Sequence, residues 1–351
     1  MSSATSLQRI RSAAVHSILL PGIMLIHPAT FAQQPQTVSQ EVTNAATAPA
    51  DGTEQLQLWP DGHPEPRVPI DPPERRETAA DGLTRRFNVS NPRLIIHRPQ
   101  KVLPANDSRR TTAIIVAPGG GFGRLSDEHE GLDVCRWLTS RGVTAIQLVY
   151  RTPTSRHPTP FTGPVQDLQK ALIEVRKNAE GLNIDPENVG VMGFSAGGQT
   201  ALIAAYGDPL IPEQTSQKEN DTQHEPFRPD FLMLIYPYQV LGHAEKQIAG
   251  DGATGETTTR LRPEVHPDQA HIPTFIAQSS DDQASAPEGS IQLYLELRKR
   301  GIPAELHLYE SGGHGFGMRP RNAGNGAHDW SGRAEVWLRM HEWMPSSQET
   351  K

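Results

Sequence analysis

The stretch "GVMGFSAGGQTA" (residues 190–201) places Ser195 between two glycines, each two positions away, directly after a short apolar run. The run at 189–194 is typical of a strand, and residues 197–206 are typical of a helix. Glycines on both sides allow the strand and the helix to approach each other closely and leave the serine hydroxyl exposed. The pattern G-x-S-x-G arises easily by chance in a glycine-rich chain, so Ser195 needs partners elsewhere in the sequence.

Short apolar runs alternate with amphipathic segments on both sides of this stretch. The strand candidates are compact and mostly apolar, and they lie at residues 94–99, 113–118, 143–150, 189–194, 231–237, 274–278 and 304–309. The helix candidates have apolar residues at helical spacing, and they lie at residues 130–142, 164–182 and 288–301. Alternation of strand and helix predicts an open α/β sheet with mostly parallel strands and helices on both faces.

A base and an acid follow Ser195 in the chain. A serine hydroxyl is a weak nucleophile unless an imidazole takes its proton. His314 lies in "ESGGHGFG" (310–317), a glycine-rich loop after the last predicted strand, where its ring can reach the sheet edge. Asp281 and Asp282 come just after the strand at 274–278. One carboxylate suffices to orient the histidine, and the residues alone leave the choice between the two open.

The segment "APGGGFG" (117–123) follows a predicted strand and can turn its backbone N–H groups toward a substrate carbonyl. The N–H groups of Gly120 and Gly121, together with that of Ala196, would form an oxyanion hole. A phosphate-binding role is disfavoured, because the sequence has no G-x-G-x-x-G that opens a helix and no Walker lysine. One cysteine, and histidines without metal-site spacing, predict no metal site and no cofactor.

Composition narrows the class of partner. The net charge is −7 without a long basic run, so nucleic acid is not an expected partner.

The N-terminal residues have the pattern of an export signal. Arg9 and Arg11 precede an apolar stretch at 13–26, and Ala32 offers a cleavage point, which predicts a signal peptide over residues 1–32. The alternative is an ordinary N-terminal helix. The stretch is too short for a membrane anchor, so a secreted or periplasmic protein is expected.

The remaining domain organisation follows from segment composition. Residues 33–55 are rich in Gln, Thr, Ala and Pro and predict a flexible linker, which leaves 56–346 as the catalytic domain. Two long polar segments, 207–230 and 242–271, interrupt the alternation. We expect both to follow elements at the edge that carries Ser195. They are either loops that contact substrate or surface insertions.

From Leu56 to Trp343 the chain resembles secreted α/β-hydrolases of the esterase/lipase class, and more narrowly the acetylxylan-esterase-like group. The segments that carry the resemblance are "LWPDGHPEP" (58–66) and residues 117–151, 164–172, 183–198, 229–237 and 301–318. The resemblance implies an α/β-hydrolase fold with about eight strands and a Ser–His–Asp triad. It also implies an acylated plant polysaccharide such as xylan as substrate, with removal of acetyl or small aromatic acyl groups.

Alignment with the group places Asp281 on the position of the catalytic acid, with Asp282 as the alternative. The chain departs from the group at Gln278, where a histidine is common, and at "DQASAPEG" (282–289), where an apolar run is common. Two other functions remain as alternatives. One is a serine peptidase of the prolyl-oligopeptidase type, which shares the order of the triad but has a large N-terminal propeller. The other is a catalytically silent saccharide-binding protein.

Overall fold

The computed structural model describes residues 54–99, 111–211, 225–242, 260–319 and 326–345. All of them belong to one compact unit, Ala48–Lys351. The predicted signal peptide and all but the last two residues of the predicted linker lie outside the described residues. Within the described ranges, no helix is both long enough and apolar enough to cross a membrane.

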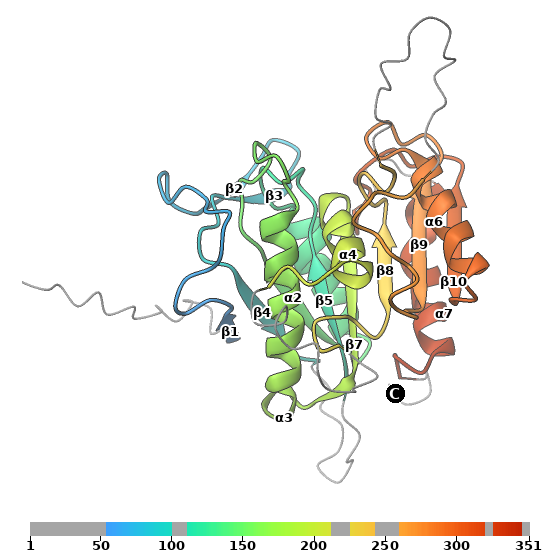
Figure 1. Cartoon of the computed structure of the whole chain (residues 1–351), viewed down its shortest axis with the longest axis horizontal. Helices are drawn as coiled ribbons and strands as arrows, with labels where there is room; N and C mark the ends of the chain where they lie inside the picture. Colours follow the sequence, from blue (N-terminus) through green and yellow to red (C-terminus); the bar gives the residue numbers. More distant parts are fainter. Residues whose placement is uncertain (1–53, 100–110, 212–224, 243–259, 320–325, 346–351) are drawn as a thin grey trace, which may run out of the picture. The chain divides into compact units, whose positions relative to one another are not determined.

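In the described part of the chain, the main sheet has eight strands in the order β1-β4-β6-β5-β7-β8-β9-β10 (Figure 1). Its strands are β1 (Glu54–Gln57), β4 (Arg93–His97), β5 (Thr111–Ala117), β6 (Thr144–Val149), β7 (Ile184–Phe194), β8 (Leu232–Ile235), β9 (Thr274–Ser279) and β10 (Ala304–Tyr309). The pairs β1–β4 and β4–β6 are antiparallel, and the strands from β6 to β10 pair in parallel. The predicted mostly parallel sheet of about eight strands is therefore confirmed. A separate hairpin is formed by β2 (Arg75–Thr78) and β3 (Thr84–Phe87).

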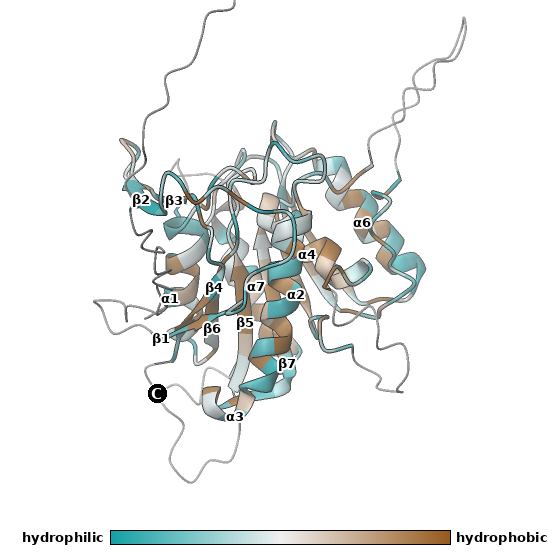
Figure 2. Ribbon diagram, turned by 60° about the vertical axis from the view of Figure 1, so that its left-hand side comes forward, coloured by the Kyte–Doolittle hydropathy of each residue, from teal (hydrophilic) through white to brown (hydrophobic). Residues whose placement is uncertain are grey.

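Helices cover both faces of the sheet. They are η1 (Glu128–Leu132), α1 (Asp133–Thr139), α2 (Thr162–Lys177), α3 (Ala179–Leu182), α4 (Ala196–Tyr206), α6 (Pro287–Lys299), η2 (Gly326–Asp329) and α7 (Trp330–Met340). Residues of α2, α4 and α6 share one buried cluster with the sheet, and residues of α1 and α7 share the other. Figure 2 shows the contrast in hydropathy, since β5 is brown whereas α2 is brown on one side and teal on the other.

Alternation along β5 explains how one strand serves both layers. Ile115 lies in the cluster with α2 and α4, whereas Ile114 and Val116 lie in the cluster with α1 and α7. Successive side chains of a strand point to opposite faces. All three side chains are fully buried, and this explains why the parallel strands are near-continuous apolar runs in the sequence.

One domain boundary and the position of one loop differ from the predictions. The linker was predicted to end at residue 55, but β1 begins at Glu54, and Glu54 and Gln55 pair with Ile96 and Ile95 of β4. The segment 207–230 was expected at the edge that carries Ser195. It instead begins at the far end of α4, and it leads to the start of β8, where the Asp230 N–H donates to Val189 O. A connection from a helix to the next parallel strand lies at the opposite edge from a strand-to-helix turn.

Candidate active site

Ser195 occupies the turn between β7 and α4 in a backbone conformation that few residues adopt. Its φ is 49° and its ψ is −118°, and it is the residue before the first turn of α4. A positive φ at a non-glycine residue costs energy and is found mainly where the surroundings over-determine it. The Ser195 N–H donates to Ile235 O at 3.1 Å and its carbonyl accepts from Tyr238 N–H at 2.9 Å. These bonds fix the turn to the last residue of β8 and to the segment that follows it.

The glycines on both sides of Ser195 are required by close packing. A Cβ on Gly193 would lie 2.5 Å from Gly197 O, and a Cβ on Gly197 would lie 2.1 Å from Ala117 O. Both distances are far below a normal contact, and the atoms approached belong to backbone that cannot move away cheaply. The predicted role of the two glycines in bringing strand and helix together therefore agrees with the geometry.

We predict that Gly197→Ala destabilises the fold by about 3 kcal/mol or more, because the new methyl group overpacks against the β5 backbone. The matched control is Gly181→Ala in α3, where a Cβ would meet nothing within 4 Å. That change should be neutral or stabilising by up to about 1 kcal/mol. Urea unfolding of both variants measures the difference, and equal stabilities would contradict the close approach.

The structure places His314 against Ser195. The Ser195 hydroxyl and His314 Nε2 are 2.8 Å apart, and His314 Nδ1 is 2.8 Å from Asp282 Oδ2. Ser195 is only 8% exposed, whereas the His314 side chain is 27% exposed. The sequence-predicted nucleophile and base therefore meet at one edge of the sheet, from turns after β7 and β10.

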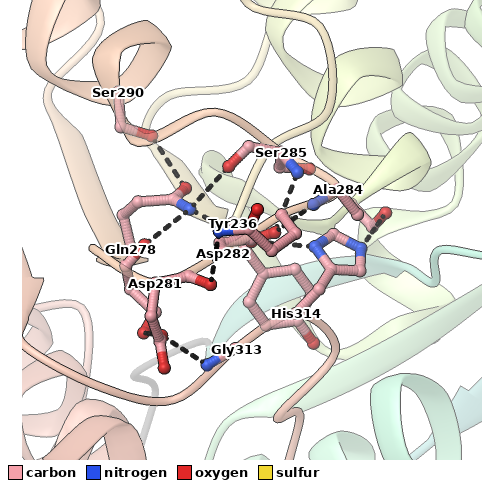
Figure 3. A network of polar contacts seen from close by, with 12 residues as sticks. Tyr236, Gln278, Asp281, Asp282, Ala284, Ser285, Ser290, Gly313 and His314 are labelled. Carbon is pink, nitrogen blue, oxygen red and sulfur yellow. Dashed lines mark hydrogen bonds and ion pairs between the residues drawn. The ribbon is translucent and has the colours of Figure 1, made fainter.

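The prediction that Asp281 is the partner of His314 is wrong, and the alternative Asp282 takes this place (Figure 3). The chain turns tightly after β9, with the Asp282 N–H donating to Ser279 O. This turn leaves Asp281 exposed and directs Asp282, which is 4% exposed, back toward His314. Asp281 instead accepts hydrogen bonds from Ser279 Oγ and from the Gly313 N–H. It therefore anchors the loop that carries His314.

Hydrogen bonds hold the Asp282 carboxylate ionised and oriented. Its Oδ1 accepts from the N–H groups of Ala284 and Ser285, each at 2.8 Å, and its Oδ2 also accepts from Gln278 Nε2 at 3.1 Å. Burial alone would raise the pKa of Asp282, but the hydrogen bonds from His314 and Ser285 outweigh it and lower that pKa below its ordinary value. A carboxylate fixed in this way stabilises the tautomer of His314 whose Nε2 can accept the serine proton.

The glycine-rich loop after β5 lies against Ser195. A Cβ on Gly119 would be 2.8 Å from Ser195 Cβ, so the loop passes directly beside the predicted nucleophile. Gly120 and Gly121 have φ values of 132° and 62°. In the described part of the chain, no hydrogen bond engages their N–H groups. Ala196 is the first residue of α4, and its N–H has no acceptor within the helix. These three predicted donors remain available to a substrate oxygen.

Further buried polar side chains complete the surroundings of the site. Gln278 is fully buried; its Nε2 donates to Ser285 O as well as to Asp282, and its Oε1 accepts from Ser290 Oγ. Glu130 and Tyr236 lie in segments that the apolar pattern assigned to a helix and a strand, and no local signal marks them. Within the described ranges, no group of three or more His, Cys, Asp or Glu side chains is placed to hold a metal ion.

Comparison with known proteins supports the family that the motifs indicated. The BD-FAE family model matches residues 101–297, more than half of the chain. The chain belongs to the BD-FAE family. The match to the BD-FAE model includes Ser195 and Asp282, whereas His314 lies beyond it. The predicted resemblance to acetylxylan-esterase-like α/β-hydrolases is confirmed at this level.

Curated relatives of this BD-FAE protein match three fifths or slightly more of its length. It is 32% identical over 226 residues to an acetylxylan esterase of Xylanibacter ruminicola, covering 62% of this chain and 43% of that protein. It is 29% identical over 219 residues to endo-1,4-beta-xylanase B of Butyrivibrio fibrisolvens, covering 60% of this chain and 33% of that protein. The chain therefore spans less than half the length of these relatives.

Solved structures confirm the α/β-hydrolase fold of this BD-FAE protein. An acetyl ester-xyloside bifunctional hydrolase from Caldicellulosiruptor lactoaceticus is similar with a TM-score of 0.56 and 28% identity, over 83% of this chain and 97% of that chain. Thermogutta terrifontis esterase 2, phosphorylated by paraoxon, has a TM-score of 0.58 and 22% identity, over 80% of this chain and 98% of that chain. At that identity the second structure supports the fold alone.

Proposed function

We propose that the protein is a serine carboxylic ester hydrolase that removes acetyl or other small acyl groups from plant polysaccharide such as xylan. The observation that carries the proposal is the continuous line of hydrogen-bond distances from Ser195 through His314 to Asp282, beside a glycine-rich loop. Similarity to a protein named acetylxylan esterase and to a protein named endo-1,4-beta-xylanase supports xylan as the polysaccharide.

In the proposed reaction, Ser195 Oγ attacks the acyl carbonyl carbon while its proton passes to His314 Nε2. The carbonyl oxygen becomes an oxyanion, which the N–H groups of Gly120, Gly121 and Ala196 stabilise. The tetrahedral intermediate then expels the sugar oxygen, which takes the proton from His314. The result is a free sugar hydroxyl and an acyl ester on Ser195.

Hydrolysis of the acyl ester repeats these steps with water as the nucleophile. His314 takes one proton from the water, the new oxyanion forms in the same place, and collapse returns that proton to Ser195 and releases the carboxylic acid, which ionises in solvent. Asp282 stays ionised throughout and stabilises the imidazolium form of His314. The pKa of Asp282, lowered by its hydrogen bonds, suits this role.

We also propose that the chain is exported, with cleavage near Ala32. The basic and apolar segments at residues 9–26 support a signal peptide, and a polymeric substrate that cannot enter the cell fits an exported enzyme. N-terminal sequencing of protein recovered from the periplasm or medium tests this directly. A mature chain that still begins at Met1 would refute it.

Acyl-chain length gives the test of the proposed function. A pocket gains only about 1–3 kcal/mol of discrimination per methylene, so a site for small acyl groups should prefer them gradually. We expect kcat/KM to fall steadily from acetyl to butyryl to octanoyl p-nitrophenyl esters. Acetylated xylo-oligosaccharide should release acetate, and EDTA should not change the rate.

Addition of a prolyl amide substrate and a saccharide-binding measurement to this assay distinguishes the esterase from the peptidase and the binding protein. A preference for octanoyl over acetyl would refute the carbohydrate-esterase assignment and leave the triad intact. Faster cleavage of a prolyl amide than of any ester would favour a peptidase. Saccharide binding without turnover of any ester or amide would identify a binding protein.

A further inference from the structure

A buried carboxyl group lies behind the oxyanion loop and outside the triad. Glu130 belongs to the π-helix η1 and is 3% exposed. Its Oε2 accepts a hydrogen bond from the Gly119 N–H at 2.8 Å, and its Oε1 accepts one from the Tyr236 hydroxyl at 2.9 Å. His129 Nε2 lies 3.5 Å from the same Oε1. Both oxygens of Glu130 therefore have partners inside the protein.

Tyr236 connects this carboxyl group to the loop that carries His314. It follows β8 directly, is fully buried, and has a φ of 41°. Its hydroxyl oxygen accepts a hydrogen bond from the Gly317 N–H at 3.0 Å. The edge contact between the rings of Tyr236 and His314 has a centroid distance of 5.1 Å, and Figure 3 shows the two side chains next to each other. Tyr236 therefore contacts the proposed base as well as Glu130.

These contacts form one line of hydrogen bonds across the back of the site. It runs from the Gly119 N–H to Glu130, and from Glu130 through the Tyr236 hydroxyl to the Gly317 N–H. Gly119 passes directly beside Ser195, as its packing shows, and Gly317 lies on the same loop as His314. The line therefore connects the turns after β5, β8 and β10. A buried polar network with every member satisfied holds one arrangement of the segments it joins.

We infer that Tyr236 and Glu130 are positioning residues, which hold the oxyanion loop and the His314 loop in their working arrangement around Ser195. This inference rests on the proposed ester hydrolysis at the same site. Neither residue contacts the acyl group in the proposed reaction. Their effect is on the placement of Gly120 and Gly121, whose N–H groups act on charge that develops only in the transition state.

The protonation state of Tyr236 is consistent with its place in the line. Burial is the largest cause that raises its pKa, and the neighbouring Glu130 carboxyl group adds to it, so the pKa of Tyr236 lies well above the ordinary value. The hydroxyl thus keeps its proton and can donate to Glu130. The same hydroxyl has a free lone pair for the Gly317 N–H.

The test removes the Tyr236 hydroxyl alone. Tyr236→Phe keeps the ring against His314, and we expect kcat on p-nitrophenyl acetate to fall on the order of 10- to 100-fold, less than the loss of a hole donor itself. KM should stay within about threefold, because ground-state binding is not affected. The rate at which a fluorophosphonate probe labels Ser195 should fall by a similar factor, since that attack also builds charge on an oxygen in the hole.

Tyr206→Phe is the matched control. Tyr206 is fully buried at the end of α4, and its hydroxyl contacts Ile272 O and Thr274 Oγ1 at distances of 2.7 and 3.0 Å. Its removal costs a buried hydrogen bond far from Ser195, so Tm should fall while kcat and labelling rate stay near those of the unmodified protein. If both variants lose kcat in proportion to their loss in Tm, the role of Tyr236 is only structural and the inference is overturned.

Glu130→Gln tests the line from its other end, and also serves if Tyr236→Phe does not fold. We expect it to lower kcat and the labelling rate as Tyr236→Phe does, and the double variant to be scarcely slower than the worse single variant. Additive losses would overturn the inference. Labelling does not depend on the acyl group or sugar. An unmodified protein that labels rapidly but hydrolyses no ester would refute the proposed substrate class, while the labelling rates of the variants would still decide this inference.

Discussion

Replacement of Ser195 by alanine should lower kcat for ester hydrolysis by roughly a million-fold. The change removes the oxygen that attacks the carbonyl, and His314 and Asp282 cannot compensate, because they act through that oxygen. The residual rate would come from the oxyanion donors and from substrate positioning alone. The fold should be little affected, since the bond to His314 is the only hydrogen bond of the Ser195 side chain among those that the structure describes.

The measurement combines turnover with detection of the covalent intermediate. After acid quenching in the presence of p-nitrophenyl acetate, mass spectrometry should find an added acetyl mass on the peptide that contains Ser195. The alanine variant should lack it. Ser140→Ala is a suitable control, because Ser140 lies at the end of α1 and its hydroxyl donates to Trp137 O. Near-normal turnover by Ser195→Ala would refute the proposed mechanism.

The sheet was predictable because most of its strands are buried on both faces. The apolar run at 113–118 covers most of β5 and the run at 231–237 contains β8, and the hydrophobic side chains of both strands are fully buried. Strands without an apolar run were missed. β1 reads "EQLQ", and β2 reads "RRET" with every residue exposed, so neither carries the signal that marks a buried strand. The pairing of β1 depends on β4, which is distant in sequence, whereas β2 pairs with the adjacent β3 in a hairpin made mostly of polar residues.

The sequence predicted a site residue where a chemically suitable side chain comes directly after a predicted strand. Ser195 and His314 follow strands and stand in glycine-rich turns, so their meeting at one edge follows from parallel topology. The choice between Asp281 and Asp282 depended on the direction of one turn after β9, which spacing does not encode. Glu130 and Tyr236 were missed for another reason. The hydrogen bond that joins them spans 106 residues of sequence, and each residue also fits a buried element.

The two aspartates should therefore differ sharply when each is changed to asparagine. Asp282→Asn should lower kcat roughly ten-thousand-fold, because an asparagine amide that donates to His314 Nδ1 favours the tautomer with a proton on Nε2. That tautomer cannot accept the proton of Ser195. Asp281→Asn should lower kcat by less than about tenfold, because its amide oxygen can still accept from Ser279 Oγ and the Gly313 N–H.

Kinetics on p-nitrophenyl acetate with both variants decide the assignment, with Tm measured in parallel. Asp282→Asn places an amide N–H₂ group where Oδ2 now accepts from Gln278 Nε2, so some loss of stability is expected as well. Such a loss alone cannot lower the kcat of the fraction that remains folded by four orders of magnitude. A larger loss of kcat in Asp281→Asn than in Asp282→Asn would return the catalytic acid to Asp281. The turn after β9 would then have to rearrange during catalysis, since Asp281 now contacts the backbone of the His314 loop rather than the ring.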